Sequence, residues 1–194
     1  MASKSCFEAS SPALAFFELN PTNATKYYWA QVDSGGIGSR KWPRDFVGFT
    51  GCMSLTVDTG TFAADFVWSG HLLPLVSDRV LAILDSNSLA GFSTYRARLT
   101  NKGVEIPGYC GLAISGRGGP NHPKAYAGGH IKGTTIRKVE GLYPTQWDGS
   151  DLFTLDDVPG AILATEKVRC LFKKEKVTNC RFTPAEEFSI GRDI

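Results

Sequence analysis

The sequence lacks any apolar run long enough to cross a lipid bilayer. A membrane-spanning helix needs about 20 largely apolar residues in succession, and the apolar stretches of this chain are far shorter. Near the N-terminus, Lys4 is followed by Glu8 and serines instead of the apolar core of a secretion signal. We therefore expect a protein that stays in the cytoplasm, where it is made.

Cysteines are few, and their spacing does not suit cross-links or metal binding. The chain has five of them, Cys6, Cys52, Cys110, Cys170 and Cys180. Their number is odd, they lie far apart, and no two form a C-x-x-C pair. This pattern argues against a disulfide framework and against a structural zinc site. We expect reduced, mostly buried thiols.

Strong net charge and the common catalytic motifs are also missing. Lys and Arg number 21 against 19 for Asp and Glu, and no basic run alternates with aromatic residues, so nothing indicates nucleic-acid binding. The motifs G-x-S-x-G and H-E-x-x-H are absent, and the G-x-x-x-x-G spacing of Gly111 and Gly116 continues with Arg117 where a phosphate loop has Lys. We assign no catalytic, cofactor-binding or metal-binding residues and expect no cofactor.

What the sequence does contain is one pattern that occurs twice. Residues 75–84 and 163–172 align without a gap at an offset of 88 positions. In each copy a hydroxyl residue, Ser77 or Thr165, precedes an acid, a base and an apolar stripe at i, i+3 and i+4 spacing. A hydroxyl N-cap, an acid in the first turn and such a stripe together predict a helix that packs on a core. The alternative is coincidence, since capped amphipathic helices are common.

These patterns predict an α+β fold: a mixed, largely antiparallel sheet with two short N-capped helices, produced by an internal strand-helix-strand duplication. We expect the first helix over 78–85, and a loosely held arm over 1–24. Strands are predicted at 27–32, 46–50, 53–57, 62–68, 93–99, 109–114, 134–139, 152–155, 160–163 and 181–183. Residues 1–70 form a strand-rich part of the same domain, 71–188 its main part, and 189–194 a tail.

The sharpest change of composition lies at 115–133, which holds six glycines and two prolines. We predict a long surface loop without regular structure, and long loops in compact domains are commonly functional or mobile. An insertion without a role is the alternative. Together with a second loop, it supplies our candidate partner-binding residues: Arg117, His122, Lys124, Tyr126, Trp147, Asp148 and Asp151.

Several segments resemble immunity family eleven of the bacterial polymorphic toxin systems. They are 77–80, 95–99, 109–114, 152–153, 159–166 and 177–184. The resemblance covers residues 72–188, and its most specific part is the closing Arg181-Phe182-Thr183-Pro184. It implies a small α+β cytoplasmic protein without catalytic residues. Residues 1–70 show no signature of the family, and the 115–133 loop looks like an insertion.

The function we expect is therefore inhibition by binding. An immunity protein neutralises a cognate antibacterial toxin, secreted or injected as by a type VI secretion system, inside the cell that produces it, and the toxin is encoded by a neighbouring gene. Two other hypotheses stay open. One is a small hydrolase-like enzyme that uses His122 or His130 as a general base. The other is a structural or adaptor component of a secretion or phage particle.

Overall fold

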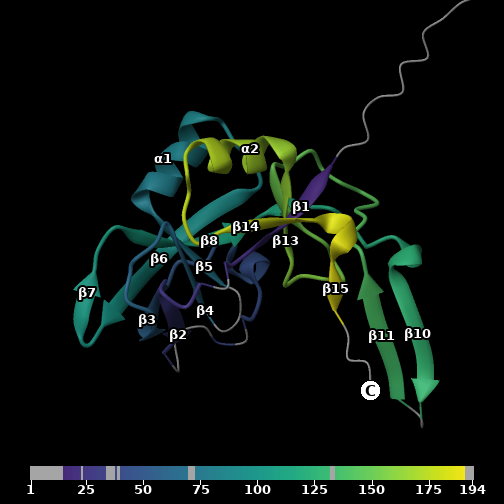
Figure 1. The fold of residues 1–194 in the computed structure, drawn as a ribbon, viewed down its shortest axis with the longest axis horizontal. Helices are drawn as coiled ribbons and strands as arrows, with labels where there is room; N and C mark the ends of the chain where they lie inside the picture. Colours follow the sequence, from purple (N-terminus) through teal and green to yellow (C-terminus); the bar gives the residue numbers. More distant parts are fainter. Residues whose placement is uncertain are drawn as a thin grey trace, which may run out of the picture.

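The computed structural model describes residues 15–22, 24–33, 38, 40–69, 73–131 and 134–190, without the side chains of 126–131 and 134–137. Strands make up most of the regular structure, and two α-helices lie together along one side of it (Figure 1). The fold is mixed α+β with largely antiparallel pairing, as predicted. Neither of the two helices is long and apolar enough to cross a membrane.

The first sheet closes on itself. Its strands are β2 (Trp29–Val32), β3 (Cys52–Thr59), β4 (Phe66–Ser69), β5 (Pro74–Ser77), β6 (Phe92–Asn101), β7 (Val104–Ile106) and β8 (Tyr109–Ile114). They pair in the order β3-β2-β4-β5-β8-β6-β7, and β3 pairs in parallel with β6 as well. This additional pairing joins β3, β2, β4, β5, β8 and β6 into a closed six-stranded barrel, which goes beyond the predicted sheet.

Alternate residues of the barrel strands pack in two different hydrophobic cores. On β4, Val67 packs in the cluster inside the barrel, whereas Phe66 and Trp68 pack in the cluster beneath the helices. Side chains alternate between the two faces of a strand, so a strand with a core on each side is apolar throughout, as β4 nearly is. Phe46, from the 3₁₀ helix η1 (Pro43–Phe46), joins the inner cluster and stacks on Tyr95, with ring centroids 4.7 Å apart.

A second sheet has the order β14-β1-β13-β12-β9. Its strands are β1 (Phe16–Asn20), β9 (Gly116–Arg117), β12 (Leu152–Thr154), β13 (Ile162–Thr165) and β14 (Arg181–Pro184). A third consists of β10 (Tyr126–Ile131), β11 (Thr134–Glu140) and β15 (Ser189–Ile190), flanked by the 3₁₀ helices η2 (Pro123–Ala125) and η3 (Ala185–Glu187). The β10–β11 hairpin extends away from the rest of the fold (Figure 1).

The two aligned stretches adopt the same structure position by position. Helices α1 (Asp78–Ser86) and α2 (Glu166–Lys174) have the same length and start 88 positions apart. The turns after them match too: Ser88 and Lys176 both have positive φ, as do Gly91 and Asn179. The amide of Leu89 donates to Leu84 O, and 88 positions later Val177 donates to Phe172 O. The correspondence therefore extends well beyond the ten residues that the sequence aligned.

The chain consists of two halves, β1–β7 and β8–β15, and these halves exchange a strand. β8 follows the first half in sequence but lies between β5 and β6, while β1, at the start of the chain, lies between β13 and β14. The registers coincide: Gly111 of β8 pairs with Leu75 and Tyr95, and Glu18 of β1 pairs with Leu163 and Thr183, each 88 positions further on. Each sheet thus takes a central strand from the other half of the chain.

Two aspartates repeat this reciprocal arrangement. The carboxylate of Asp65, in the first half, accepts a bond from the amide of Thr178, which follows α2, at 2.9 Å. The carboxylate of Asp151, in the second half, accepts a bond from the amide of Ala90, which follows α1, at 3.0 Å. Thr178 and Ala90 are again 88 positions apart, so each aspartate fixes the exit of the other half's helix.

The N-cap prediction is confirmed for one helix only. The hydroxyl oxygen of Ser77 accepts a bond from the amide of Val80 at 3.3 Å. Thr165 stands at the equivalent position with extended backbone, but its side chain accepts no bond from the first turn of α2. Instead, its hydroxyl donates to Asp151 Oδ1 at 3.2 Å. The prediction of a hydroxyl cap at Thr165 is therefore wrong.

Three other local predictions are wrong. Residues 46–50 are not a strand: Phe46 ends η1, whose start is held by Asp45, which accepts bonds from the amides of Lys41 and Trp42 at 3.0 Å each. Residues 16–20, assigned to a loose arm, form β1 inside the second sheet. Residues 115–133 contain β9, η2 and β10 in place of an irregular loop.

The described cysteines are free, but their predicted burial is wrong. Cys52 and Cys170 are exposed, and Cys110 and Cys180 are half-buried. Cys6 lies outside the described residues. Burial raises the pKa of the Cys110 thiol to about 11 and that of Cys180 to about 12, so the two half-buried thiols stay protonated at neutral pH and behave as small apolar side chains.

Candidate protein-binding surface

The two loops that sequence analysis selected lie against each other. Several hydrogen bonds join them, among them Gln146 N to Gly118 O at 3.0 Å, His122 N to Tyr143 O at 3.0 Å, and Thr145 Oγ1 to Pro120 O at 2.7 Å. Residues 117–124 and 143–148 consequently form one continuous surface. We call it the loop surface and define it by Arg117, His122, Lys124, Tyr143 and Asp148.

A buried asparagine holds the loop surface from beneath. Asn121 is only 3% exposed, and its Oδ1 accepts bonds from the amides of His122 and Tyr143 at 3.0 and 2.7 Å. Its Nδ2 donates to Gly141 O at 3.1 Å, and its own amide donates to Asp157 Oδ1 at 2.9 Å. A buried amide with its donors and acceptors paired in this way fixes the backbone around it, so both loops have a defined shape.

Charges of both signs lie at one end of the loop surface. Asp148 accepts bonds from the amides of Arg117 and Ser150 at 2.8 and 2.9 Å. Burial raises the pKa of this carboxyl, but the bonds from Ser150 and Arg117 together outweigh burial and lower the pKa below its ordinary value. Asp156 lies between two guanidinium groups, 3.8 Å from Arg117 and 3.6 Å from Arg44.

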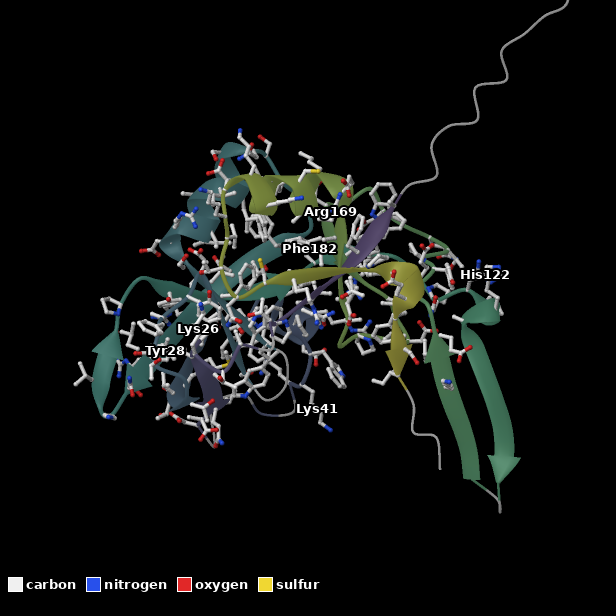
Figure 2. All side chains as sticks on the ribbon, in the orientation of Figure 1. Lys26, Tyr28, Lys41, His122, Arg169 and Phe182 are labelled. Atoms are coloured by element: carbon white, nitrogen blue, oxygen red, sulfur yellow. The ribbon has the colours of Figure 1, made fainter. Side chains whose placement is uncertain are left out.

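An exposed histidine and lysine lie at the other end. His122 Nδ1 accepts a bond from the amide of Lys124 at 3.1 Å, and the ammonium of Lys124 lies 3.8 Å from the ring centroid of Tyr143. Figure 2 shows His122 at the outer edge of the molecule, above the β10–β11 hairpin. Both side chains face solvent, where a partner could reach them.

The remaining candidates are placed differently. Trp147 is half-buried: its ring packs edge-on against Phe16 at 5.2 Å, and its Nε1 donates to Ser150 O at 2.9 Å. Asp151 is one of the two aspartates that fix a helix exit, and its side chain is 14% exposed. Both residues therefore make mainly internal contacts. The side chain of Tyr126 and that of His130 lie outside the described residues.

An apolar groove adjoins the loop surface. It has a volume of about 400 Å³ and is lined by Ala15, Phe16, Phe17, Leu142, Tyr143, Pro144, Pro184, Ala185 and Glu186. Tyr143 belongs to both the groove and the loop surface, so Lys124, above that ring, stands at the groove's rim. The groove could not be predicted from the sequence, because the fold assembles it from three distant segments, none of which carries a motif. Nor could the contact between Arg44 and Asp156, since these two residues meet only in the folded chain.

This combination of features suits recognition of a protein. Exposed charged and aromatic side chains around an apolar depression are typical of interface centres and their polar rims. In the described part of the chain, no three His, Cys, Asp or Glu side chains gather closely enough to hold a metal ion. Neither a protein-family model nor a curated protein sequence matches this chain.

Proposed function

We propose that this chain is an immunity protein, which binds a cognate antibacterial toxin in the cytoplasm of the producing cell and neutralises it without catalysing a reaction. The observation that carries the proposal is that two loops, selected from sequence as a binding surface, are joined by hydrogen bonds into one surface beside an apolar groove. The resemblance of residues 72–188 to immunity family eleven supports the same conclusion. The toxin, encoded by a neighbouring gene, is the proposed partner.

The rigidity of the loop surface favours binding. A loop that becomes ordered only in a complex pays a large entropy cost, whereas a surface that is already ordered avoids it. Asn121, buried with its side-chain oxygen and nitrogen bonded to both loops, provides that order before any partner arrives. The exposed Arg117 and Lys124 would then engage a partner without reorganisation, and the groove would accept its apolar residues.

We also infer that the chain arose by internal duplication. The offset of 88 positions relates the helices, the turns after them, the strand registers and the bonds of the two aspartates. The stretch that resembles the immunity family, 72–188, includes both helices. The resemblance therefore describes the duplicated framework, while the loop surface lies in the part that looks inserted. In this proposal the framework is shared with relatives, and the loops select the toxin.

The proposal is tested by protection of a cell that expresses the neighbouring toxin. Replacing His122 and His130 together with alanine should weaken protection by less than about tenfold if the protein acts by binding, because His122 is one of several side chains of the loop surface. If either imidazole were a general base, activity would fall about 100-fold or more. Failure of the wild-type protein to protect or to bind the toxin would reject the immunity function and leave the particle component as the next hypothesis.

The loop surface itself is tested by charge reversal. Shortening residues 117–128 is not informative, because this segment contains Arg117 of β9, the buried Asn121 and η2, and its removal would unfold the neighbourhood. Replacing Arg117 and Lys124 with glutamate keeps the backbone bonds and inverts two exposed charges. We expect this variant to unfold like the wild type but to bind toxin at least about tenfold more weakly. Lys102→Glu, in the turn between β6 and β7, is the matched control and should bind normally. Normal binding by the double variant would exclude the loop surface.

A further inference from the structure

A second concave site lies at the junction of α2 and β14. Its volume is about 230 Å³, and it is lined by Arg169, Phe172, Lys173, Val177, Cys180, Arg181 and Phe182. We call it the cationic hollow. Three of these side chains are cations, while Phe172 and Phe182 contribute rings that meet edge to face with centroids 5.9 Å apart. In Figure 2 the labelled Arg169 and Phe182 lie next to each other at this junction.

The equivalent positions of the first half carry no cluster of cations. Positions 88 residues earlier hold Leu81 for Arg169, Asp85 for Lys173, Phe92 for Cys180 and Ser93 for Arg181. Each difference in charge therefore makes the second half more positive than the first. In addition, the second half has the much smaller Cys180 where the first has the aromatic Phe92. Since the backbone framework is the same, the cationic hollow is a property of these side chains and is not required by the fold.

The three cations of the cationic hollow differ in the partners that they already have. Arg169 Nε donates to Glu166 Oε2 at 2.6 Å, and the guanidinium lies over the ring of Phe17, 4.7 Å from its centroid. Arg181 has Glu18 as its neighbouring acid, a carboxyl whose pKa is raised chiefly by burial. The pKa of Glu166 is lowered chiefly by its bond from Arg169 and also by the charge of Lys173, although Lys173 forms no salt bridge with the residues that the structure describes. An incoming anion would find this ammonium available and the two guanidinium groups already oriented.

Size and lining restrict the ligand. Pockets for cofactors and drug-sized molecules have volumes of about 300–1,000 Å³, so the cationic hollow, at about 230 Å³, suits a single side chain. Phe172, Val177 and Phe182 offer an apolar floor that an inorganic anion cannot use. An aspartate or glutamate of a protein matches both the apolar floor and the cations, because its methylene groups contact the rings and its carboxylate meets the cations.

We propose that the cationic hollow is an anchor site for an acidic side chain of a protein partner. The partner is the toxin of the proposed function, on which this inference rests, and the anchor adds a second contact to the loop surface. The negative charge specifies which part of the toxin docks here: an exposed acidic residue beside an apolar one. Lys173 supplies the charge that selects this residue, and Arg169 and Arg181 complete the recognition of its carboxylate.

The site can be tested without the toxin. The probe is the acetylated, amidated dipeptide Phe-Glu, added to the ¹⁵N-labelled full-length protein at millimolar concentration. We expect shifts of the backbone signals of Lys173, Cys180 and Arg181, and shifts at least about fivefold smaller with the isosteric dipeptide Phe-Gln. Inorganic phosphate should have little effect at the same concentration and ionic strength. Equal shifts from Phe-Gln, equal or larger shifts from phosphate, or no shift at these residues would each overturn the proposal.

A matched pair of variants then tests the site in the complex. Lys173 and Lys174 are consecutive exposed lysines of α2, but only Lys173 lines the cationic hollow. We expect Lys173→Glu to weaken toxin binding about tenfold or more and Lys174→Glu to weaken it less than about twofold. Equal effects would mean a general charge effect and overturn the anchor. If wild-type protein does not bind the toxin, the proposed function fails, whereas the dipeptide experiment still decides the site.

Discussion

At the scale of single residues, the pair Asp65 and Asp151 accounts for much of the architecture. Neither stands out in the sequence, yet each carboxylate bonds the residue that opens its own half's helix, Ser77 or Thr165, and an amide at the exit of the other half's helix. An aspartate that accepts several bonds in a site largely screened from water stabilises what it joins. Here it joins the two halves.

We predict that Asp65→Asn lowers the free energy of unfolding at pH 7 by about 2 kcal/mol. The carboxylate, 12% exposed, accepts bonds from Thr178, Ser77 and Arg79, and an amide side chain cannot accept them all. Urea unfolding of both proteins measures the difference. Asp78→Asn, a change of the same kind in the first turn of α1, is the control and should cost clearly less.

The same substitution predicts a pH dependence. Burial raises the pKa of Asp65, but the bonds from Thr178, Arg79 and Ser77 outweigh it, so the net pKa lies below the ordinary value. A carboxyl with a lowered folded-state pKa adds stability above its unfolded pKa, about 3.9, and loses it as the pH falls through the folded value. The difference between wild type and Asp65→Asn should therefore be constant from pH 5 to 7 and shrink below about pH 4. A constant difference at all pH values would contradict this assignment.

The two helix starts make a separate prediction. Ser77→Ala should cost about 1 kcal/mol through loss of the bond from the Val80 amide. Asp65 also loses the hydroxyl of Ser77 as a donor in that variant. Thr165→Ala removes no cap bond, but it should cost a similar amount because Asp151 loses the equivalent donor. Thr165→Val keeps the shape and removes only the hydroxyl, so it should cost nearly as much as alanine. Thermal unfolding of the three variants measures this; wild-type stability of Thr165→Val would show that the bond to Asp151 is unimportant.

At the scale of elements, local pattern predicted the helices better than the strands. The apolar spacing of 80, 83 and 84 located α1 to within one residue at its end, and the equivalent residues located α2. By contrast, the closed barrel, the insertion of β1 into the second sheet and the groove depend on pairing between distant segments. Residues 16–20 look like an arm because nothing next to them in sequence indicates the β13 and β14 neighbours that bury them. The two loops selected from the sequence do lie together in the structure, but two of the candidate residues in them, Trp147 and Asp151, make mainly internal contacts.

The helices give a prediction about packing. Leu84 and Phe172 occupy equivalent positions, are 0% and 2% exposed, and belong to the same core cluster. Truncation of either to alanine removes several buried carbons and leaves a cavity, so each should lower the free energy of unfolding by about 3 kcal/mol. Asp85→Ala and Lys173→Ala, the exposed neighbours on the same helices, should change it by less than about 0.5 kcal/mol. Denaturant unfolding compares the four variants, and a small effect of Leu84→Ala would contradict a shared core.

At the scale of the whole molecule, the strand exchange makes the two halves depend on each other. In a protein made of two independent repeats, each half would contain all strands of its own sheet. Here β8 completes the barrel of the first half, and β1 joins β13 to β14 in the second. The arrangement resembles a domain-swapped dimer contained in one chain. The core beneath the helices likewise contains residues of both halves, such as Leu84 and Phe172.

Division of the chain between Pro107 and Gly108, in the segment from β7 to β8, tests this dependence. We predict that neither fragment 1–107 nor fragment 108–194 unfolds cooperatively alone, because the first lacks β8 and the second lacks β1. Mixed together, they should form a one-to-one complex whose circular dichroism matches that of the intact chain. Its thermal midpoint should rise with protein concentration, since folding is then coupled to association. Size-exclusion chromatography and thermal melts of each fragment and of the mixture measure this. A cooperative transition of fragment 1–107 alone would show that the barrel closes without β8, and the exchanged strands would then not be what holds the halves together.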